Sequence, residues 1–254
     1  MGLGLTNQHV RRLRRLMGRR SARRDEGVLV VEGAVLVREA VAAGRRIQCQ
    51  FVAPGIESVE GAGVVYELDP GVIDKVSDTE TPSGIVAIVE HRSVGIGELD
   101  SATFVLVAEA ISDPGNLGTL VRSAEAAGVD AVVVTQGTVD STNPKVVRAS
   151  AGALFHVPIV EVEALDDVKR AGFTTYGTSS HRGIDHRSVA YAPRVAVVIG
   201  NEAHGIADHA SIDEWITIEH VGRSESLNAA MAGTLVAFEV ARHRRGPSGT
   251  VTPS

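Results

Sequence analysis

Three polar segments of the sequence each follow an apolar run and contain residues that could bind or transform a ligand. The first, residues 113–122, reads as a turn leading into a helix. Such a helix start offers free backbone N–H groups and a positive dipole end, which favour an anion. Asn116 and Arg122 lie six residues apart, close to opposite faces of a straight helix. They therefore share a site only if Asn116 still lies in the turn.

The second segment, 198–205, and the third, 218–231, also come directly after strand-like sequences. In the second, Gly200 at the strand end lets a ligand approach the backbone, and Glu202 follows it. In the third, Ser226 and Asn228 stand at the start of an apolar helix. Taken singly, each segment also fits an ordinary structural role, because Ser, Asn and acidic residues are common helix caps.

The elements that must position these segments are apolar runs alternating with helical stretches. In the first 90 residues we expect strands at 28–31, 50–52, 63–66 and 85–89, and helices at 33–43 and 69–76. The second of these helices is predicted to begin with Asp69 as N-cap and Pro70 at its first position. Farther along we expect strands at 103–108, 131–134, 173–178 and 195–199, with helices at 116–127, 144–151, 163–171 and 226–243.

The later strands are apolar without a period-2 pattern, as is typical of strands buried on both faces of a mostly parallel sheet. The sequence therefore predicts an α/β protein whose ligands bind at the carboxyl ends of the strands. We expect a basic N-terminal helix over 1–24, a small α/β domain over 25–92, a linker over 93–100, a parallel-sheet domain over 101–245 and a disordered tail over 246–254.

Charge is distributed unevenly along the chain. The net charge of the 254 residues is −6, yet residues 1–27 carry eight arginines against Asp25 and Glu26. Because the Debye length is only about 8 Å in physiological salt, a dense basic segment still attracts phosphate locally. We expect this segment to bind RNA, although a solvated helix or one that docks on an acidic partner fits the same composition. The candidate RNA-binding residues are Arg11, Arg12, Arg14, Arg15, Arg19, Arg20, Arg23 and Arg24.

Several classes of protein are excluded or disfavoured. No apolar run approaches the roughly 20 residues of a membrane span, and the arginine-rich start lacks the apolar core of a signal peptide. One cysteine, Cys49, excludes an internal disulfide framework, and its usual role is that of a small buried side chain. No P-loop, dinucleotide-binding, serine-hydrolase or H-E-x-x-H pattern occurs. We expect a soluble cytoplasmic protein that holds no metal.

In order, the three segments read DPGNLGTLVRSAEAAG, VVIGNEAHGI and ITI followed by GRSESLNAAMAG. Together they resemble the three signature motifs of the TrmH (SpoU) branch of the SPOUT RNA methyltransferases. The stretch NPKVVRASAGALFHVP is similar to that family as well, and VVEGAVLVREAVAAG and ELDPGVIDKVSDTETPSGIVAIV resemble its small RNA substrate-binding domain. The resemblance covers roughly residues 25–243.

The resemblance implies a C-terminal SPOUT domain with a deep trefoil knot, a homodimer with the site near the subunit interface, and S-adenosylmethionine as cofactor. It implies methylation of a ribose 2′-hydroxyl. Motif matching places cofactor contacts on Gly200, Ile218, Leu227 and Thr178. The family's functional polar positions fall on Asn116, Arg122, Glu202, Ser226 and Asn228. For Arg122 two roles stay open, proton acceptor or phosphate clamp, and the high pKa of a guanidinium makes the clamp simpler.

The sequence departs from the family pattern after Ile218, where Glu219 and His220 replace the usual Pro-Met pair beside the cofactor pocket. The alternative to an active enzyme is an RNA-binding module that kept the fold and lost the activity. Against it, all the functional polar residues are present. The appended N-terminal domain favours ribosomal RNA over transfer RNA as substrate.

Overall fold

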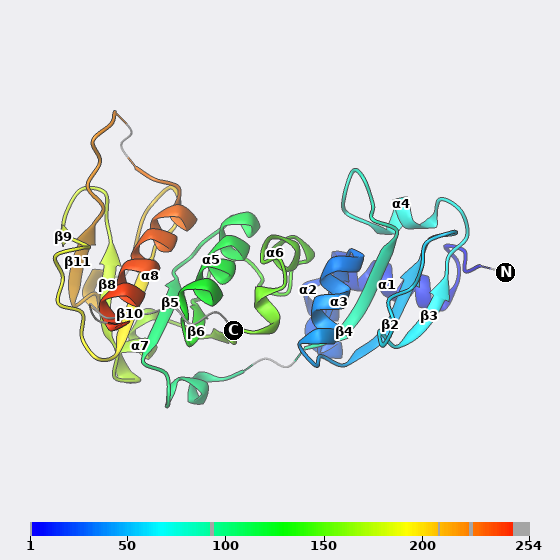
Figure 1. Cartoon of the computed structure of the whole chain (residues 1–254), viewed down its shortest axis with the longest axis horizontal. Helices are drawn as coiled ribbons and strands as arrows, with labels where there is room; N and C mark the ends of the chain where they lie inside the picture. The colour runs from blue at the N-terminus through cyan, green and yellow to red at the C-terminus, as the bar shows by residue number, and fades with distance from the viewer. Residues whose placement is uncertain (1, 92–93, 208, 224–225, 246–254) are drawn as a thin grey trace. The chain divides into compact units, whose positions relative to one another are not determined.

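The computed structural model describes residues 2–91, 94–207, 209–223 and 226–245, and the expected tail lies outside them. The chain folds into two units, each built around its own sheet (Figure 1). The first unit comprises residues 1–93 together with 140–156, and the second comprises residues 94–139 together with the chain from 157 onward. The sequence-based domain limits do not include this second stretch of the first unit.

The first unit is a four-stranded mixed sheet with helices around it. Its elements are α1 (Gln8–Gly18), α2 (Arg20–Glu26), β1 (Val28–Glu32), α3 (Ala34–Ala42), β2 (Ile47–Val52), β3 (Val64–Glu67), α4 (Val72–Val76), β4 (Ile85–Glu90) and α6 (Pro144–Ala149). The strand order is β1-β4-β2-β3. β4 pairs antiparallel with both neighbours, and β2 pairs parallel with β3.

The basic N-terminal segment forms two helices rather than one, and the first of them belongs to the core. Asn7 caps α1, and Val10, Leu13 and Leu16 on its inner face are fully buried. They pack with strand residues such as Val30 and Phe51 in one apolar cluster. The amphipathic pattern predicted from the sequence is therefore present, and it attaches the arginines to a rigid element.

The second unit is a seven-stranded, wholly parallel sheet, in the order β7-β6-β5-β10-β8-β11-β9. Its strands are β5 (Phe104–Ala108), β6 (Ala131–Val134), β7 (Ile159–Glu161), β8 (Thr174–Thr178), β9 (Ile184–Asp185), β10 (Val195–Ile199) and β11 (Glu214–Thr217). Its helices are α5 (Pro114–Ala127), α7 (Leu165–Arg170) and α8 (Ala229–Arg245), with 3-10 turns at Ile96–Leu99 and His209–Ser211. The predicted parallel sheet is confirmed.

Helices α5 and α8 pack closely together. A Cβ on Gly233 of α8 would lie only 2.4 Å from the side chain of Leu120 on α5, and Ser123 and Thr234 share a hydrogen bond of 2.7 Å. α8 also contacts β10 in the middle of the sheet. The knot implied by the resemblance stays a prediction, because the connections around α8 include residues 208 and 224–225, outside the described part.

Two helix starts differ from the prediction. α4 begins at Val72, with Gly71 at φ +75° as its N-cap, so Asp69 and Pro70 lie before the helix and the predicted cap is wrong. The left-handed backbone at position 71 explains why a glycine stands there. α8 begins at Ala229, so Ser226 lies before it, and Asn228 accepts hydrogen bonds from the N–H groups of Ala230 and Met231.

Candidate active site at the carboxyl edge of the parallel sheet

Most of the predicted cofactor-binding and catalytic residues gather at one edge of the second unit because its strands are parallel. Thr178 ends β8, Gly200 follows β10 and Ile218 follows β11, so all three lie at the carboxyl ends of neighbouring strands. The start of α5 follows β5 at the same edge. This is the place where open α/β sheets bind ligands.

A chain of hydrogen bonds joins the three motifs. The Nδ2 group of Asn116 donates to Oε1 of Glu202 over 2.8 Å, and Nδ2 of Asn228 donates to Oδ1 of Asn116 over 2.9 Å. Glu202 also accepts from the backbone N–H and the hydroxyl of Ser112. These hydrogen bonds fix the three motifs relative to one another, through one residue of each motif.

The carboxyl group of Glu202 is stabilised in its ionised form. Partial desolvation would raise its pKa, but the hydrogen bonds from Asn116 and Ser112 outweigh it and lower the pKa to about 2. Glu202 is therefore a carboxylate at neutral pH and does not act as a proton donor there.

A cavity of about 660 Å³ opens beside this network. Seven of the predicted residues line it: Thr178, Gly200, Glu202, Ile218, Ser226, Leu227 and Asn228. One part of its wall is aliphatic, formed by Ile199, Ile206, Ile216, Ile218 and Val236. Its volume lies within the usual range for small-molecule and cofactor sites, and an apolar wall with a few polar groups is typical of them.

The turn after β10 depends on Gly200 and Asn201. A Cβ on Gly200 would lie 2.4 Å from the backbone of Gly205 and Ile206, so any other residue would push the turn apart. Asn201 exchanges backbone hydrogen bonds with Gly205 and donates from its side chain to the carbonyl of Ala110 over 2.8 Å. Ala110 itself has a φ of +54°, a strained conformation for a residue with a Cβ.

The structure does not bring Arg122 into the cavity. Asn116 is already the third residue of α5, so the six-residue spacing turns Arg122 away from it. Arg122 is exposed, and among the described residues its side chain makes no hydrogen bond or ion pair. Of the five polar positions matched to the family motifs, it alone lies apart from both the cavity and the hydrogen-bond network.

Sequence reasoning did not assign several other residues of this cavity. Arg182 lines it with its guanidinium 3.7 Å from the centre of the Trp215 ring, which also lines it. Asn201 was missed too, although an asparagine directly after a strand-end glycine is a turn signal. His220, by contrast, was expected beside the cofactor pocket; it lines the cavity, and its Nε2 atom is buried without a hydrogen-bond partner among the described residues.

The eight N-terminal arginines divide into structural and exposed ones. Arg23 is only 4% exposed, pairs with Asp140 at 2.5 Å and donates to the carbonyl of Leu16, so it belongs to the core of the first unit. Arg12 and Arg15 both bind Glu26; its partial burial would raise its pKa, but these contacts lower it. Arg20 also lies within 3.6 Å of Asp140.

The exposed members of the set are different. Arg11, Arg14 and Arg19 are exposed, and in the described part of the chain their side chains have no hydrogen-bond or ion-pair partner. They line a hollow on α1 together with Gln8, Arg12 and Arg15. Arg24 has an interaction of its own.

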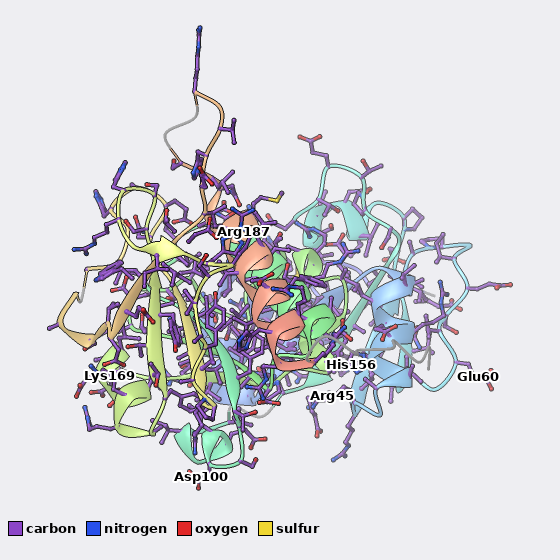
Figure 2. All side chains as sticks on the ribbon, turned by 60° about the vertical axis from the view of Figure 1, so that its left-hand side comes forward. Arg45, Glu60, Asp100, His156, Lys169 and Arg187 are labelled. Atoms are coloured by element: carbon purple, nitrogen blue, oxygen red, sulfur yellow. The ribbon has the colours of Figure 1, made fainter. Side chains whose placement is uncertain are left out.

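The segment 140–156 is attached to the first unit by several side chains. Arg148 lies 3.4 Å from the buried carboxylate of Glu32, and His156 lies 2.8 Å from Glu39. Arg45 donates to the carbonyl of Phe155, so that Arg45 and His156 lie near each other (Figure 2).

Within the described ranges, no group of three or more His, Cys, Asp or Glu side chains could hold a metal ion. None of the described helices is long and apolar enough to cross a membrane.

Comparisons with known proteins identify the family of the chain. Residues 103–238 match the SpoU rRNA Methylase family, and residues 7–87 match the MRM3-like substrate binding domain. The chain is 32% identical to the 23S rRNA (guanosine(2553)-2′-O)-methyltransferase RlmP of Bacillus subtilis, over 94% of this chain and 97% of that one.

Two solved structures are similar over nearly the whole chain. The SpoU methyltransferase AviRb from Streptomyces viridochromogenes, in complex with AdoMet, has a TM-score of 0.84 at 26% identity, covering 94% of this chain and 99% of that one. An AdoMet-bound rRNA methyltransferase from Sinorhizobium meliloti has a TM-score of 0.83 at 28% identity, covering 98% of both chains.

Proposed function

The chain belongs to the SpoU rRNA methylase family, and we propose that this S-adenosylmethionine-dependent RNA methyltransferase modifies a ribose 2′-hydroxyl of ribosomal RNA. The observation that carries the proposal is the hydrogen-bond network of Asn116, Glu202 and Asn228 beside the cavity. The similarity to an enzyme named for 23S rRNA supports the choice of ribosomal over transfer RNA. The cytoplasmic location expected from the sequence stays a prediction.

We place the cofactor in the cavity of the second unit. Its volume of about 660 Å³ and its aliphatic wall fit an adenosyl group, and the unpartnered Nε2 of His220 is a polar atom that a ligand would satisfy. Gly200, Ile218, Leu227 and Thr178 are the residues that would hold it. When bound, S-adenosylmethionine supplies an electrophilic methyl group on a sulfonium, whose leaving group is neutral.

Transfer of the methyl group breaks its bond to sulfur, forms a bond to the 2′-oxygen and releases the hydroxyl proton, which passes to solvent. The residues of this chain then mainly have to orient the hydroxyl. Glu202 fixes Asn116, and Asn116 in turn fixes Asn228, so two carboxamides are held for the substrate and the cofactor. Ser226 lines the same cavity. Holding two reactants in line is worth up to about 7–11 kcal/mol in favourable cases, and positioning is the main task of this site.

We assign Arg122 to the RNA phosphate next to the reacting ribose. Its guanidinium stays protonated in proteins, and a planar guanidinium binds phosphate oxygens in pairs. Because Arg122 lies outside the cavity of its own chain, this role requires that it reach the cavity of a second copy.

A homodimer is part of the proposal for this reason and for one more. α8 carries exposed apolar side chains at helical spacing, namely Met231, Leu235 and Phe238, which are 57%, 48% and 46% exposed. Leu227, just before the helix, continues the same line of residues. Exposed apolar patches of this kind mark interaction sites, and α8 stands next to the cavity.

For the RNA we propose contact through exposed arginines of α1 and through Arg19, which directly follows it. Arg11, Arg14 and Arg19 have no partners among the described residues, whereas Arg12 and Arg15 are held by Glu26 and Arg23 by Asp140. The match of residues 7–87 to a substrate binding domain supports this surface.

The test is transfer of labelled methyl from S-adenosylmethionine to unmodified rRNA and tRNA offered separately, with Arg122→Ala as control. The products are digested to nucleosides. Label in a 2′-O-methyl nucleoside from rRNA is the expected result. Label only from tRNA would overturn the substrate. RNA binding without transfer to either RNA or to ribosomal subunits would overturn the enzymatic role.

A further inference from the structure

One buried polar atom of the cavity, Nε2 of His220, has not yet been given a role. His220 lies on the connection after β11, two residues beyond Ile218, and lines the cavity. Its Nε2 is buried and has no hydrogen-bond partner in the described part of the protein. A buried imidazole nitrogen that has lost water without gaining a partner costs free energy, so its place needs a reason.

Three of the other polar side chains around the cavity are already engaged. Glu202 accepts from Asn116 and Ser112, and the hydroxyl of Thr178 donates to the carbonyl of Val198 over 3.0 Å. Asn228 uses its carbonyl oxygen to cap α8. His220 therefore differs from its neighbours in that its buried nitrogen is left for a ligand.

The lining of the cavity indicates which part of a ligand His220 could meet. Ile218 precedes it on the same connection, and Ile216 and Ile199 from β11 and β10 add to the aliphatic wall. Aliphatic side chains pack well against the flat faces of a purine, whose polar atoms lie on its edge. A neutral imidazole nitrogen donates to a ring nitrogen or accepts from an exocyclic amine, depending on its tautomer.

We propose that Nε2 of His220 forms a hydrogen bond with the purine edge of the adenosyl group, which makes His220 a specificity-determining residue for the cofactor. This inference rests on the proposed placement of the cofactor in this cavity. Ribosomal RNA is not involved in the contact, so binding can be measured without it.

The experiment is calorimetric titration of the full-length protein with two ligands. S-adenosylhomocysteine has both the adenosyl group and the amino-acid part, whereas 5′-methylthioadenosine lacks the amino-acid part. For His220→Met, which keeps the size but loses the nitrogen, we expect Kd to rise about tenfold for both ligands. For His220→Gln, whose carboxamide reaches the position of Nε2, we expect a rise of at most about threefold.

Two controls accompany these variants. Glu219→Gln changes the neighbouring residue, which is 72% exposed and outside the cavity lining, and should leave both Kd values unchanged. His220→Asn places its carboxamide nearer to Nδ1 than to Nε2 and should bind like the Met variant. If the Met variant does not fold, as judged by its thermal unfolding, the contrast between Gln and Asn decides the matter.

The possible results distinguish a failure of the His220 contact from a failure of the proposed cofactor site. Unchanged Kd values in His220→Met would overturn the inference, and so would a loss confined to S-adenosylhomocysteine, which would move the contact to the amino-acid part. A wild-type protein that binds neither ligand would contradict the placement of the cofactor instead. In methyl transfer, His220→Met should raise KM for S-adenosylmethionine with little change in kcat, because the contact is equal in the ground and transition states.

Discussion

Asn116 and Glu202, 86 residues apart in the sequence, are joined by a hydrogen bond of 2.8 Å from the carboxamide nitrogen to the carboxylate. Asn116 also accepts from Asn228. A carboxamide donates through its nitrogen and accepts through its oxygen, and Asn116 uses both atoms here. The orientation of Asn116 is therefore set by Glu202.

Replacing this carboxamide with a carboxylate tests the network. Asn116→Asp sets a like charge against Glu202 where a donor had been, and we expect kcat for methyl transfer to fall by about 100-fold or more. Asn143→Asp, at the N-cap of α6, is a matched control that should stay near wild type. Wild-type turnover by Asn116→Asp would contradict the positioning role.

The stability of the protein at low pH should depend on Glu202. Its pKa falls from 4.5 in the unfolded chain to about 2 in the folded one, so the unfolded state binds more protons between these values. The contribution of Glu202 is complete above about pH 4.5 and is lost as the pH falls toward 2. Urea unfolding at several pH values should show a smaller loss over this range for Glu202→Gln than for wild type.

Arg122 should be dispensable for stability and required for activity. It is exposed and without a partner in the described structure, so Arg122→Ala should change the free energy of unfolding by less than about 0.5 kcal/mol. We expect severe loss of methyl transfer. Mixing inactive Arg122→Ala with inactive Asn228→Ala should restore part of the activity, because one mixed site then has both residues. Failure to complement in confirmed mixed dimers would place Arg122 in its own chain's site.

The apolar side of α8 should hold the dimer together. Phe238→Glu puts a charge among Met231, Leu235 and Phe238, and we expect light scattering after size exclusion to report a monomer with greatly reduced activity. Val35→Glu is the matched control, because Val35 is 72% exposed in the first unit. A dimeric Phe238→Glu variant would locate the interface elsewhere.

The exposed arginines Arg11 and Arg14 of α1, with Arg19 after it, should account for the salt dependence of RNA binding. Replacing Arg11, Arg14 and Arg19 by Gln should weaken RNA binding and reduce the slope of log K against log salt by about 2–3, at about 0.7–0.9 per phosphate contact. Replacing Arg38, Arg46 and Lys75 by Gln removes the same charge from other exposed positions of the first unit. Equal slopes for the two triple variants would show that net charge, not this surface, is responsible. Cofactor binding should be unaffected in both.

The sequence was informative about the parallel sheet because buried strands have strong local patterns. β6 and β10 lie at the predicted residues, and α5 begins two residues earlier than expected, at Pro114 after the Asp113 cap. Parallel strands bring their carboxyl ends together, so motifs far apart in the chain could be placed at one edge. β7 and β9, with three and two residues, are too short to leave such a pattern.

Pairing between distant residues could not be predicted in the same way. Arg23 looked like its basic neighbours, and what separates it is Asp140, 117 positions later. Likewise the hydrogen bonds of Glu202 come from side chains around 90 residues away. The six-residue spacing of Asn116 and Arg122, by contrast, is local, and the sequence indicated that they share a site only if Asn116 lies in the turn, whereas the structure places Asn116 inside α5.

The segment 140–156 has a consequence for how the protein is synthesised. It belongs to the first unit but is translated after β5, α5 and β6 of the second. Until it emerges from the ribosome, Arg23 lacks Asp140 and Glu32 lacks Arg148. The first unit therefore cannot complete its folding on the ribosome before part of the second has been made, and a fragment ending at residue 93 would retain that unfinished state permanently.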